Sequence, residues 1–437
     1  MLLSRRSLGF CVCVALAAFS LARFSWAADD DVKARVKGVR ELGKGGSENI
    51  PRIEPFLSDA SVDVRLEAVK AITDIGTQRS LDPLVKATSD SDPEVQIRAT
   101  DGLVNFYVPG YLKTGLTAPL RRAGSSIKGK FTDTNDLVVD PYIQVRPEII
   151  AALGHIVSGG STMDARSNAA RAVGILRGRQ AVPDLEAALR SKDSDLIYES
   201  LVALEKIRDP SAGPSLAFLL HDLNEKVQVT AIEATGLLTN REALNELRDV
   251  LDRSRKIKVK RAALTALAQI PDPQLHGIYV TYLDNKDDGL REAAAEGLAR
   301  LKNPADSGDL ERVFNNENKT EPRISAAFAL VSLGKLGTAE FDPLRYLVNN
   351  LNSTAYRGVT RAYLIELARD PAVRQALYPA LKEAGATRDE KTGLAEVLAF
   401  SGGQDSVAPL EALSQDTDPE VSQAGLRAVK NLRARQP

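Results

Sequence analysis

The stretches SDSDPEVQIRATDGL at residues 89–103 and SQDTDPEVSQAGLRAV at residues 414–429 share a pattern, an aspartate followed by proline, glutamate and valine. The oxygen of this aspartate, Asp92 or Asp418, can accept hydrogen bonds from the free backbone amides of a first helical turn. Proline fits the first helical position because its missing N–H costs nothing there, and glutamate favours the positive end of a helix. Each stretch therefore predicts the start of a helix.

The same alignment continues along the chain at a steady interval. With the valine taken as position 1, the copies are spaced 31 to 34 residues apart, except for one wider step between residues 95 and 165. Position 5 is usually small, and position 12 is apolar and mostly large. Positions 1, 5, 9 and 12 share one helical face, so the pattern predicts an amphipathic helix whose small residue lets a neighbouring backbone approach closely. The copies start near Val32, Val64, Val95, Ala165, Leu196, Val227, Val259, Leu290, Pro322, Tyr356, Asp389 and Val421.

A second helix is predicted before most of these copies, often with a proline in its first turn, as in LDPLVKATSD, AVPDLEAALRSKD and VAPLEALSQD. Two antiparallel helices per period make a stacked array, in which each pair buries its apolar face on the next. At about 25 cal/mol per Å² of buried apolar area, one pair alone could not offset its own ordering entropy. The predicted fold class is therefore all-α, a right-handed α-solenoid of antiparallel helix pairs with a period of about 31 residues.

The alternation of P-x-L helices with D-P-E-V-x-x-x-A helices resembles the HEAT-repeat superfamily, in particular its short bacterial form named after phycobilisome lyases. The resemblance covers nearly all of residues 30–435 and implies the fold. It implies little about function, because the pattern reflects packing and the same fold has many roles.

Two groups of enzymes carry similar repeats, and neither one's chemistry is visible in these residues. Proteins similar to deoxyhypusine hydroxylase bind a di-iron centre through adjacent His-Glu pairs, whereas His155, His221 and His276 are followed by Ile, Asp and Gly. Phycobilin lyases offer no residue that can be carried over to this chain. Phosphate-binding glycine loops, GxSxG and HExxH are also missing from the sequence. We therefore expect no catalytic residues, no bound metal and no cofactor.

The first residues have the composition of an export signal. Arg5 and Arg6 precede an apolar run from Leu8 to Leu21, which is too short for a membrane span, and small residues follow at Ser25 and Ala27. SRRSLGF resembles a twin-arginine signal, and the alternative is an ordinary basic region of a general secretory signal. The expected organisation is a signal peptide at residues 1–27 and a repeat solenoid at 28–437, located in the periplasm or secreted.

Cleavage after Ala27 would change the chemistry of the chain. Cys11 and Cys13 would leave with the signal, so the mature chain would have no thiol and no disulfide. The whole chain has a formal net charge of −1, and the loss of three arginines makes it −4. Such a balance gives no general reason to expect nucleic acid or anionic lipid as a partner.

The side chains expected to be exposed on the second helix of each pair also lack a nucleic-acid pattern. Position 7 carries both signs and no aromatic series, from Lys70 and Asp101 to Arg427. Arginine recurs at position 2, and ion pairing from repeat to repeat explains this without a ligand. These arginines are Arg65, Arg166, Arg291, Arg323 and Arg357.

The wide step in the period marks an excursion at about residues 107–146. A degenerate repeat is one reading, because the step holds two periods and a few more residues. We favour an excursion, because RPEIIAALGHIVSGG makes a good first helix for the helix at 164–176. The excursion is expected to contain a short helix near 116–123 and a hairpin that pairs SIKGKF with LVVDPYIQV. Long loops in compact repeats are often functional.

The excursion is richer in aromatic residues than the chain average of 5%, and its basic residues precede any acid until Asp133. A basic and aromatic patch fits an acidic protein partner, because Tyr and Arg contribute strongly to binding. The alternative is that the aromatic side chains pack the excursion onto its own solenoid. The candidate partner-binding residues are Tyr107, Tyr111, Lys113, Arg121, Arg122, Lys128, Lys130, Phe131 and Tyr142.

The function predicted from these observations is an exported, non-enzymatic repeat scaffold that mediates protein–protein interaction. Its partner would be another protein, with an acidic surface, and the mature chain would have no membrane span. The alternative function is an accessory or chaperone-like factor for a cofactor-bearing or envelope enzyme.

The first prediction concerns export. The protein isolated from its native host should begin at Ala28, which N-terminal sequencing would show. Replacing Arg5 and Arg6 with lysine should block export if the twin-arginine route is used, and continued secretion of this variant would indicate the general route. A mature protein that still begins at Met1 would contradict cleavage.

Overall fold

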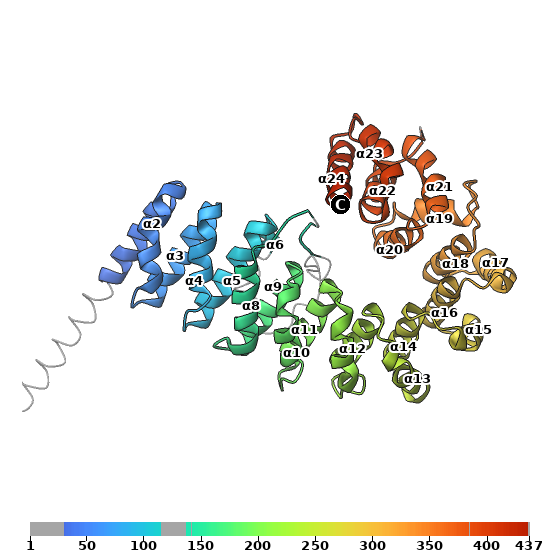
Figure 1. Cartoon of the computed structure of the whole chain (residues 1–437), viewed down its shortest axis with the longest axis horizontal. Helices are drawn as coiled ribbons and strands as arrows, with labels where there is room; N and C mark the ends of the chain where they lie inside the picture. The colour runs from blue at the N-terminus through green and yellow to red at the C-terminus, as the bar shows by residue number, and fades with distance from the viewer. Residues whose placement is uncertain (1–29, 115–136, 141, 384, 436–437) are drawn as a thin grey trace, which may run out of the picture. The chain divides into compact units, whose positions relative to one another are not determined.

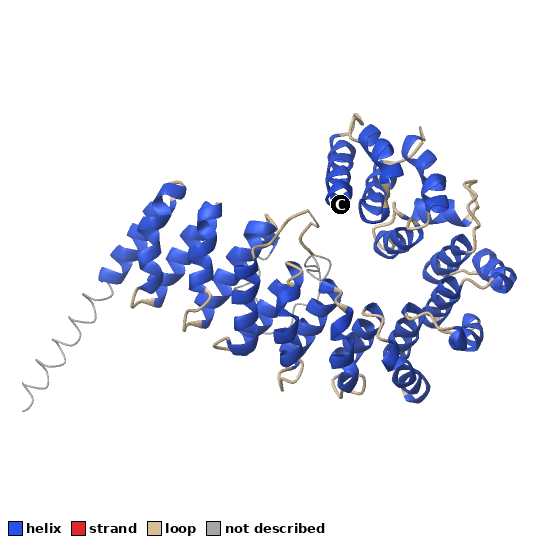
Figure 2. Ribbon diagram, viewed as in Figure 1, coloured by secondary structure: helices blue, strands red, loops and turns tan. Residues whose placement is uncertain are grey.

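The computed structural model describes residues 30–114, 137–140, 142–383 and 385–435. These residues form helices joined by loops (Figure 2). They cluster into two compact units, within residues 1–139 with 145–203 and within residues 140–144 with 204–437, called unit 1 and unit 2 below. None of the described helices is long and apolar enough to span a membrane.

Unit 1 begins with a helix over residues 30–43, the first of its repeats. The helices of the following pairs are α2 (Ile50–Ile53) with η2 (Glu54–Ser58), α3 (Val62–Ile75), α4 (Leu81–Ala87), α5 (Pro93–Tyr107), α8 (Pro147–Gly159), α9 (Met163–Ile175) and α10 (Val182–Ala188). Short 3-10 turns η1 (Ser47–Asn49), η3 (Gln78–Ser80) and η5 (Arg179–Ala181) precede α2, α4 and α10. The short helix α6 (Tyr111–Thr114) follows α5, and α11 (Ser194–Ile207) runs from unit 1 into unit 2.

Unit 2 continues the alternation of a first, outer helix and a second, inner helix (Figure 1). Its inner helices are α12 (Glu225–Leu237), α14 (Ile257–Gln269), α16 (Asp288–Leu301), α18 (Thr320–Ser332), α20 (Arg357–Leu367), α22 (Arg388–Ser401) and α24 (Pro419–Arg435). Its outer elements are η6 (Pro210–Leu219), α13 (Leu244–Arg253), α15 (His276–Leu283), α17 (Ser307–Asn316), α19 (Pro343–Asn350), α21 (Pro371–Lys382) and α23 (Val407–Leu413). The 3-10 turns η7 (Arg241–Ala243), η8 (Pro273–Leu275), η9 (Pro304–Asp306) and η10 (Gln404–Ser406) lead into outer helices.

The predicted helix starts are confirmed at both quoted stretches. Asp92 caps α5, because its Oδ1 accepts hydrogen bonds from the backbone N–H of Glu94 at 2.9 Å and of Val95 at 3.2 Å. Asp418 caps α24 in the same way through the N–H of Glu420 at 2.8 Å. Proline follows each cap at the first helical position.

The small residues at position 5 are buried inside the helix pairs, and at Gly425, which has this position in α24, a Cβ would come within 2.6 Å of the backbone nitrogen of Ser414 at the end of α23. Ala68, Ala99, Ala231, Ala263 and Ala294 have no exposed surface. Inner helices α12, α14, α16 and α18 pack consecutively on one another, and each outer helix packs on the inner helix of its pair. The all-α solenoid of antiparallel helix pairs is thus confirmed.

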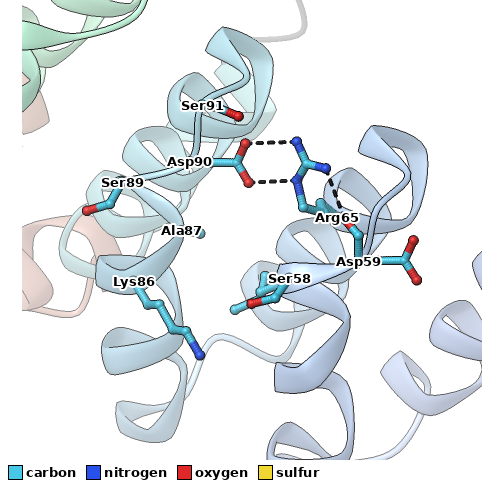
Figure 3. Close-up of a pocket in the computed structure, with 9 residues that line it drawn as sticks. Ser58, Asp59, Arg65, Lys86, Ala87, Ser89, Asp90 and Ser91 are labelled. Atoms are coloured by element: carbon cyan, nitrogen blue, oxygen red, sulfur yellow. Dashed lines mark hydrogen bonds and ion pairs between the residues drawn. The ribbon is translucent and has the colours of Figure 1, made fainter.

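Ion pairs between repeats account for three of the five arginines at position 2. Arg65 donates to both carboxylate oxygens of Asp90 at 2.7 and 3.0 Å, from α3 to the turn before α5 (Figure 3). Arg291 and Glu317 form the same two-bond pair at 2.7 and 3.1 Å, and Arg357 donates to Asp389 at 3.2 Å.

The other two arginines at position 2 bind differently. Arg166 donates to the carbonyl of Val157 at 2.7 Å, within its own helix pair. Arg323 lies over the rings of Phe314 and Tyr346, at 5.0 and 4.7 Å from their centres. Cation–π contact replaces the carboxylate there.

The excursion is an insertion between adjacent repeats, so the degenerate repeat is wrong. Helix α8 packs on α4, and α9 packs on α5. Gln96 on α5 accepts hydrogen bonds from the N–H and hydroxyl of Ser161 at 3.1 and 2.9 Å, at the turn that leads into α9. These direct contacts leave no room for another helix pair between them.

The described ends of the excursion lie where the sequence predicts, since α5 ends at Tyr107 and α8 begins at Pro147. The helix expected near 116–123 and the SIKGKF half of the expected hairpin lie outside the described residues. In the described part of the other half, residues 137–140 and 142–145, there is no strand. Instead the N–H of Val139 donates to the carbonyl of Ile175 at the end of α9, at 2.8 Å.

The second prediction tests the close contact at position 5. Ala231→Leu should lower the free energy of unfolding by about 1–3 kcal/mol, because the larger side chain overpacks the fully buried site. Denaturant unfolding measures the change, and hydrogen exchange should show the loss of protection mainly in the adjacent repeats. Ala372→Leu, at an exposed helical position, is the matched control and should change little. Equal effects of the two variants would contradict the packing role.

Candidate partner-binding surface

Positions 4, 7, 8 and 11 of the inner helices share one helical face, which we call the position-7 face. In unit 1, α6 brings Tyr111 to this face. The Tyr111 hydroxyl lies 3.5 Å from Oδ1 of Asp101 on α5, and Nδ2 of Asn168 on α9 donates to the same oxygen at 3.0 Å. The first described turn of the excursion is therefore bonded to α5, at a carboxylate that also binds the neighbouring inner helix α9.

Arg171 and Glu199, which are near Tyr111 and Asp101, form an ion pair. Arg171 on α9 donates through Nε to Glu199 on α11 at 3.0 Å and makes a second bond to it through Nη2. Burial opposes the charge of Arg171, but the Glu199 carboxylate outweighs burial and raises the pKa of the guanidinium. Arg171 therefore stays charged and joins two repeats.

The described aromatic candidates differ in how far their side chains are exposed. Tyr107 and Tyr111 are buried, with 7% and 8% of their surface exposed. The Tyr107 hydroxyl accepts a hydrogen bond from the N–H of Arg146 at 3.3 Å, and its ring packs edge-on against Phe106. These two side chains pack the excursion onto the solenoid, which leaves little of their surface for a partner, and their role as partner contacts stays a prediction. Tyr142 is 39% exposed.

The remaining candidate residues are Lys113 and five residues outside the described part of the chain. Lys113 lies on α6, and nothing of its side chain is described. The others lie outside the described residues, so their role stays a prediction from the sequence. They are Arg121, Arg122, Lys128, Lys130 and Phe131.

Unit 2 has a second polar group on the position-7 face, which the sequence analysis missed. Arg300 on α16 donates to both oxygens of Glu366 on α20 at 2.9 Å each, and to Glu296 on its own helix at 2.9 Å. Its Nη1 also lies 3.3 Å from the carbonyl of Ala268 on α14. All three guanidinium nitrogens are therefore occupied. The helical period alone places Arg300 and Glu296 together, but Glu366 is two repeats away.

Aromatic packing completes this group. The ring of Phe328 on α18 stacks on Tyr363 of α20, with ring centres 4.4 Å apart, and Arg300 lies over Phe328 at 5.4 Å. The Tyr363 hydroxyl donates to Glu296 and lies 2.9 Å from the Ser325 hydroxyl. Helices α16 and α20 thus meet across α18. Glu296 and Phe328, expected to be exposed at position 7, are buried for this reason.

Two carboxylates in unit 2 are protonated more easily than usual. Burial, with the charges of Glu296 and Glu321 nearby, raises the pKa of Glu292 to about 7. Burial, with the charge of Glu233, raises the pKa of Glu205 to about 8, and Oε1 of Glu205 has no hydrogen-bond partner among the described residues. Neither carboxylate lies beside a nucleophile within the described contacts, so the shifts indicate a cost of burial.

The histidines do not fit a di-iron centre. His155 is on α8, His221 lies 3.4 Å from Glu246, and His276 Nε2 lies 2.8 Å from Asp306 Oδ1. Over the described ranges, no three histidine, cysteine, aspartate or glutamate side chains are grouped as metal ligands.

A pocket of about 370 Å³ lies at the edge of unit 1, between η2, α3 and α4 (Figure 3). Its arginine, Arg65, points at Asp90 and also donates to the carbonyl of Asp59 at 2.9 Å. Because these bonds use all three of its nitrogens, the pocket offers a ligand little beyond Lys86 and serine hydroxyls.

Comparison with known families identifies the repeats. The family profile described as HEAT repeats matches residues 21–104, 214–275 and 244–331. The profile described as PBS lyase HEAT-like repeat matches residues 165–191, which form α9 and α10. The residues in these ranges are therefore similar to HEAT repeats of both descriptions. A curated relative, deoxyhypusine hydroxylase-B of Oryza sativa subsp. japonica, is 24% identical over 255 residues, which are 57% of this chain and 80% of the relative.

Solved structures that are similar to this chain include a phycocyanin lyase complex, a deoxyhypusine hydroxylase and Kap121p. The complex of CpcE and CpcF of phycocyanin lyase from Nostoc sp. PCC7120 is 18% identical, with 68% of this chain and 91% of that chain covered and a TM-score of 0.33. Human deoxyhypusine hydroxylase is 20% identical, with 66% and 96% covered and a TM-score of 0.28. Kap121p is 13% identical, with 87% and 45% covered and a TM-score of 0.37.

The third prediction concerns pH. The pKa of Glu205 is higher in the folded state, so the folded protein holds this proton more tightly than the unfolded chain. The stability that protonated Glu205 contributes is present below the ordinary pKa of 4.5 and is lost as pH rises through about 8. Glu205→Gln should raise the free energy of unfolding at pH 8 by about 1–3 kcal/mol, the cost of a buried charge without a partner. Denaturant unfolding across this pH range measures the difference.

Glu292→Gln is the matched control for this experiment, because the pKa of Glu292 rises only to about 7. The stabilisation by Glu292→Gln should reach its full size near neutral pH. The stabilisation by Glu205→Gln should continue to grow as the pH rises above neutral. A Glu205→Gln variant that tracks the wild type at every pH would show that the carboxylate is not buried as described.

Proposed function

We propose that this chain is an exported, non-enzymatic repeat scaffold that binds another protein through the 107–146 excursion and the adjoining position-7 face of unit 1. HEAT repeats provide the scaffold. Large repeat surfaces of this kind suit protein partners, because each repeat adds contacts without a new core.

The observation that carries the proposal is the attachment of the excursion at both of its described ends. Tyr111 is bonded to Asp101 at the start, and Val139 is bonded to Ile175 at the return. The described ends of the insertion are therefore fixed to α5 and α9. The sequence between Thr114 and Leu137 includes a basic run, which complements an acidic partner.

The alternative function is an accessory or chaperone-like factor for a cofactor-bearing or envelope enzyme. It is supported by the PBS lyase HEAT-like repeat at residues 165–191, which adjoins the excursion. A chromophore or metal that is captured together with the partner would favour this alternative.

The fourth prediction concerns the basic run. The partner is first captured from envelope extract, identified, purified and then titrated against the protein. Changing Arg121, Arg122, Lys128 and Lys130 to serine should weaken binding about tenfold and reduce its dependence on salt, because screening acts on exposed charge pairs. The melting temperature should barely change, since substitutions of exposed charges usually cost less than about 0.5 kcal/mol.

The matched control changes four exposed cations elsewhere to serine, which removes the same charge. These are Lys192, Arg369, Lys382 and Lys430. Equal binding by the two charge variants would reject the excursion as the site. Truncating Tyr111 is unsuitable as a binding test, because a buried tyrosine is expected to lower stability when removed.

A further inference from the structure

A strongly basic turn lies in unit 2, where α13 passes into α14. The stretch RSRKIKVKR at residues 253–261 has six basic residues among nine and no acid. They are Arg253, Arg255, Lys256, Lys258, Lys260 and Arg261. Most of this stretch is exposed, apart from the buried Val259.

Three of these cations are paired and three are not. Arg253 pairs with Asp249 at 2.8 Å, Lys256 with Glu225 at 3.4 Å, and Arg261 with Asp287 at 2.7 Å. No carboxylate of the described residues lies within ion-pair distance of the charged groups of Arg255, Lys258 or Lys260. The same holds for Lys286, at the turn before α16. Four unpaired cations therefore gather at one edge of two successive repeats.

A pocket of about 590 Å³ opens among these cations. Lys260 and Lys286 line it together with Ile257, Tyr282 and Leu290. Asn285 and Asp287 complete the lining, and the carboxylate of Asp287 is paired with Arg261. Ile257 is 45% exposed, which is unusual for isoleucine, and the Tyr282 hydroxyl has no hydrogen-bond partner within the described part of the chain. Burial, with the charge of Asp252, raises the pKa of Tyr282, so the hydroxyl keeps its proton and can donate.

The pocket thus combines an apolar floor with cationic and hydrogen-bonding groups. That combination suits a ligand with one apolar side chain and several carboxylates around it.

The start of α14 is unfavourable for its own helix. Its first turn contains no acid and its N-cap is Lys256, whereas α12 and α16 begin with Asn224 and Asp287 caps followed by an acidic residue. Cations at a helix N-terminus are destabilising, because they face the positive end of the helix dipole. The sequence therefore places positive charge where folding alone favours negative charge.

The surroundings of the turn limit the size of its ligand. The corresponding turn of the preceding repeat carries Asp222 and Glu225, and the following turn carries Asp284 and Asp288. A nucleic acid extending beyond one repeat would meet these carboxylates, and a flat anionic membrane needs a broader basic face. A short acidic segment of a protein reaches only Lys286 in the following turn, where the neighbouring carboxylates of Asp287 and Asp288 are already paired with Arg261.

We propose that this basic turn, Arg255, Lys258, Lys260 and Lys286 with the pocket beside Ile257, binds a short acidic segment of a protein partner. One apolar side chain of the segment fills the pocket, and the flanking carboxylates pair with the four cations. The proposal rests on the proposed role as a protein-binding scaffold and names the chemistry of a second contact, separate from the excursion.

The test uses the full mature chain and a short fluorescent peptide with one leucine flanked on both sides by glutamate and aspartate. Fluorescence polarisation should show binding that weakens with added salt. Arg255→Glu with Lys258→Glu should reduce the affinity about tenfold or more, because two attractive pairs become repulsive. The same double variant should melt no earlier than the wild type, since an acid at the start of α14 is favourable. Lost binding is thereby separated from lost folding.

Lys192→Glu with Lys430→Glu makes the same change of charge at exposed positions elsewhere and should leave peptide binding intact. Ile257→Ser should remove the preference for the leucine peptide over a matched alanine peptide. The proposal fails if the wild type does not bind the peptide, or if the Arg255 and Lys258 variant binds it as well as the wild type does.

Two further probes test the class of ligand. Tighter binding of a single-stranded oligonucleotide or of anionic phospholipid vesicles would overturn the assignment to a protein segment. The partner captured from envelope extract is measured separately. If that partner binds but the peptide does not, the scaffold function stands and the basic turn is rejected.

Discussion

The close approach of successive inner helices is the constraint on which the rest of the structure depends. Gly236 on α12 lies so near α14 that a Cβ there would come within 2.6 Å of the Cα of Ala266, and alanines of the same two helices, such as Ala231 and Ala263, are fully buried. Because the backbones are this close, polar groups on one inner helix can reach the next. The ion pairs between repeats, such as Arg65 with Asp90, follow from that spacing.

The position-7 face illustrates how this spacing affects function. Its charged residues are largely used to join repeats, as Arg171 is with Glu199 and Arg300 is with Glu296 and Glu366. Buried pairs of this kind fix geometry more than they add stability, because desolvation offsets much of their attraction. The surfaces proposed to bind a partner use other charges, and the excursion and the basic turn in unit 2 are both stretches in which the sequence concentrates cations.

Of these two proposed surfaces, the sequence analysis contained only the first. The excursion was visible as a break in the period, and the direct contact of α5 with α9 and the turn before it shows that it is an insertion. The run at residues 253–261 was equally visible as six cations without an acid. Its significance depends on which cations are paired, and the partner of Arg261, Asp287, is 26 residues away. The sequence analysis expected Tyr107 and Tyr111 to contact a partner, but both side chains are buried. Tyr107 is bonded to Arg146, a contact that is distant in sequence.

The sequence by itself determined the repeat, the caps and the apolar face, because these depend on neighbours within one helical turn or one period. Asp92 caps α5 and Ala231 is buried as the pattern requires. Only the tertiary structure decided that α16 and α20 meet across α18, which buries Phe328 and Glu296 at positions that the period alone would expose. The physical reason is that the local curvature of a stack comes from the summed packing of several helix pairs, and no single repeat encodes that sum.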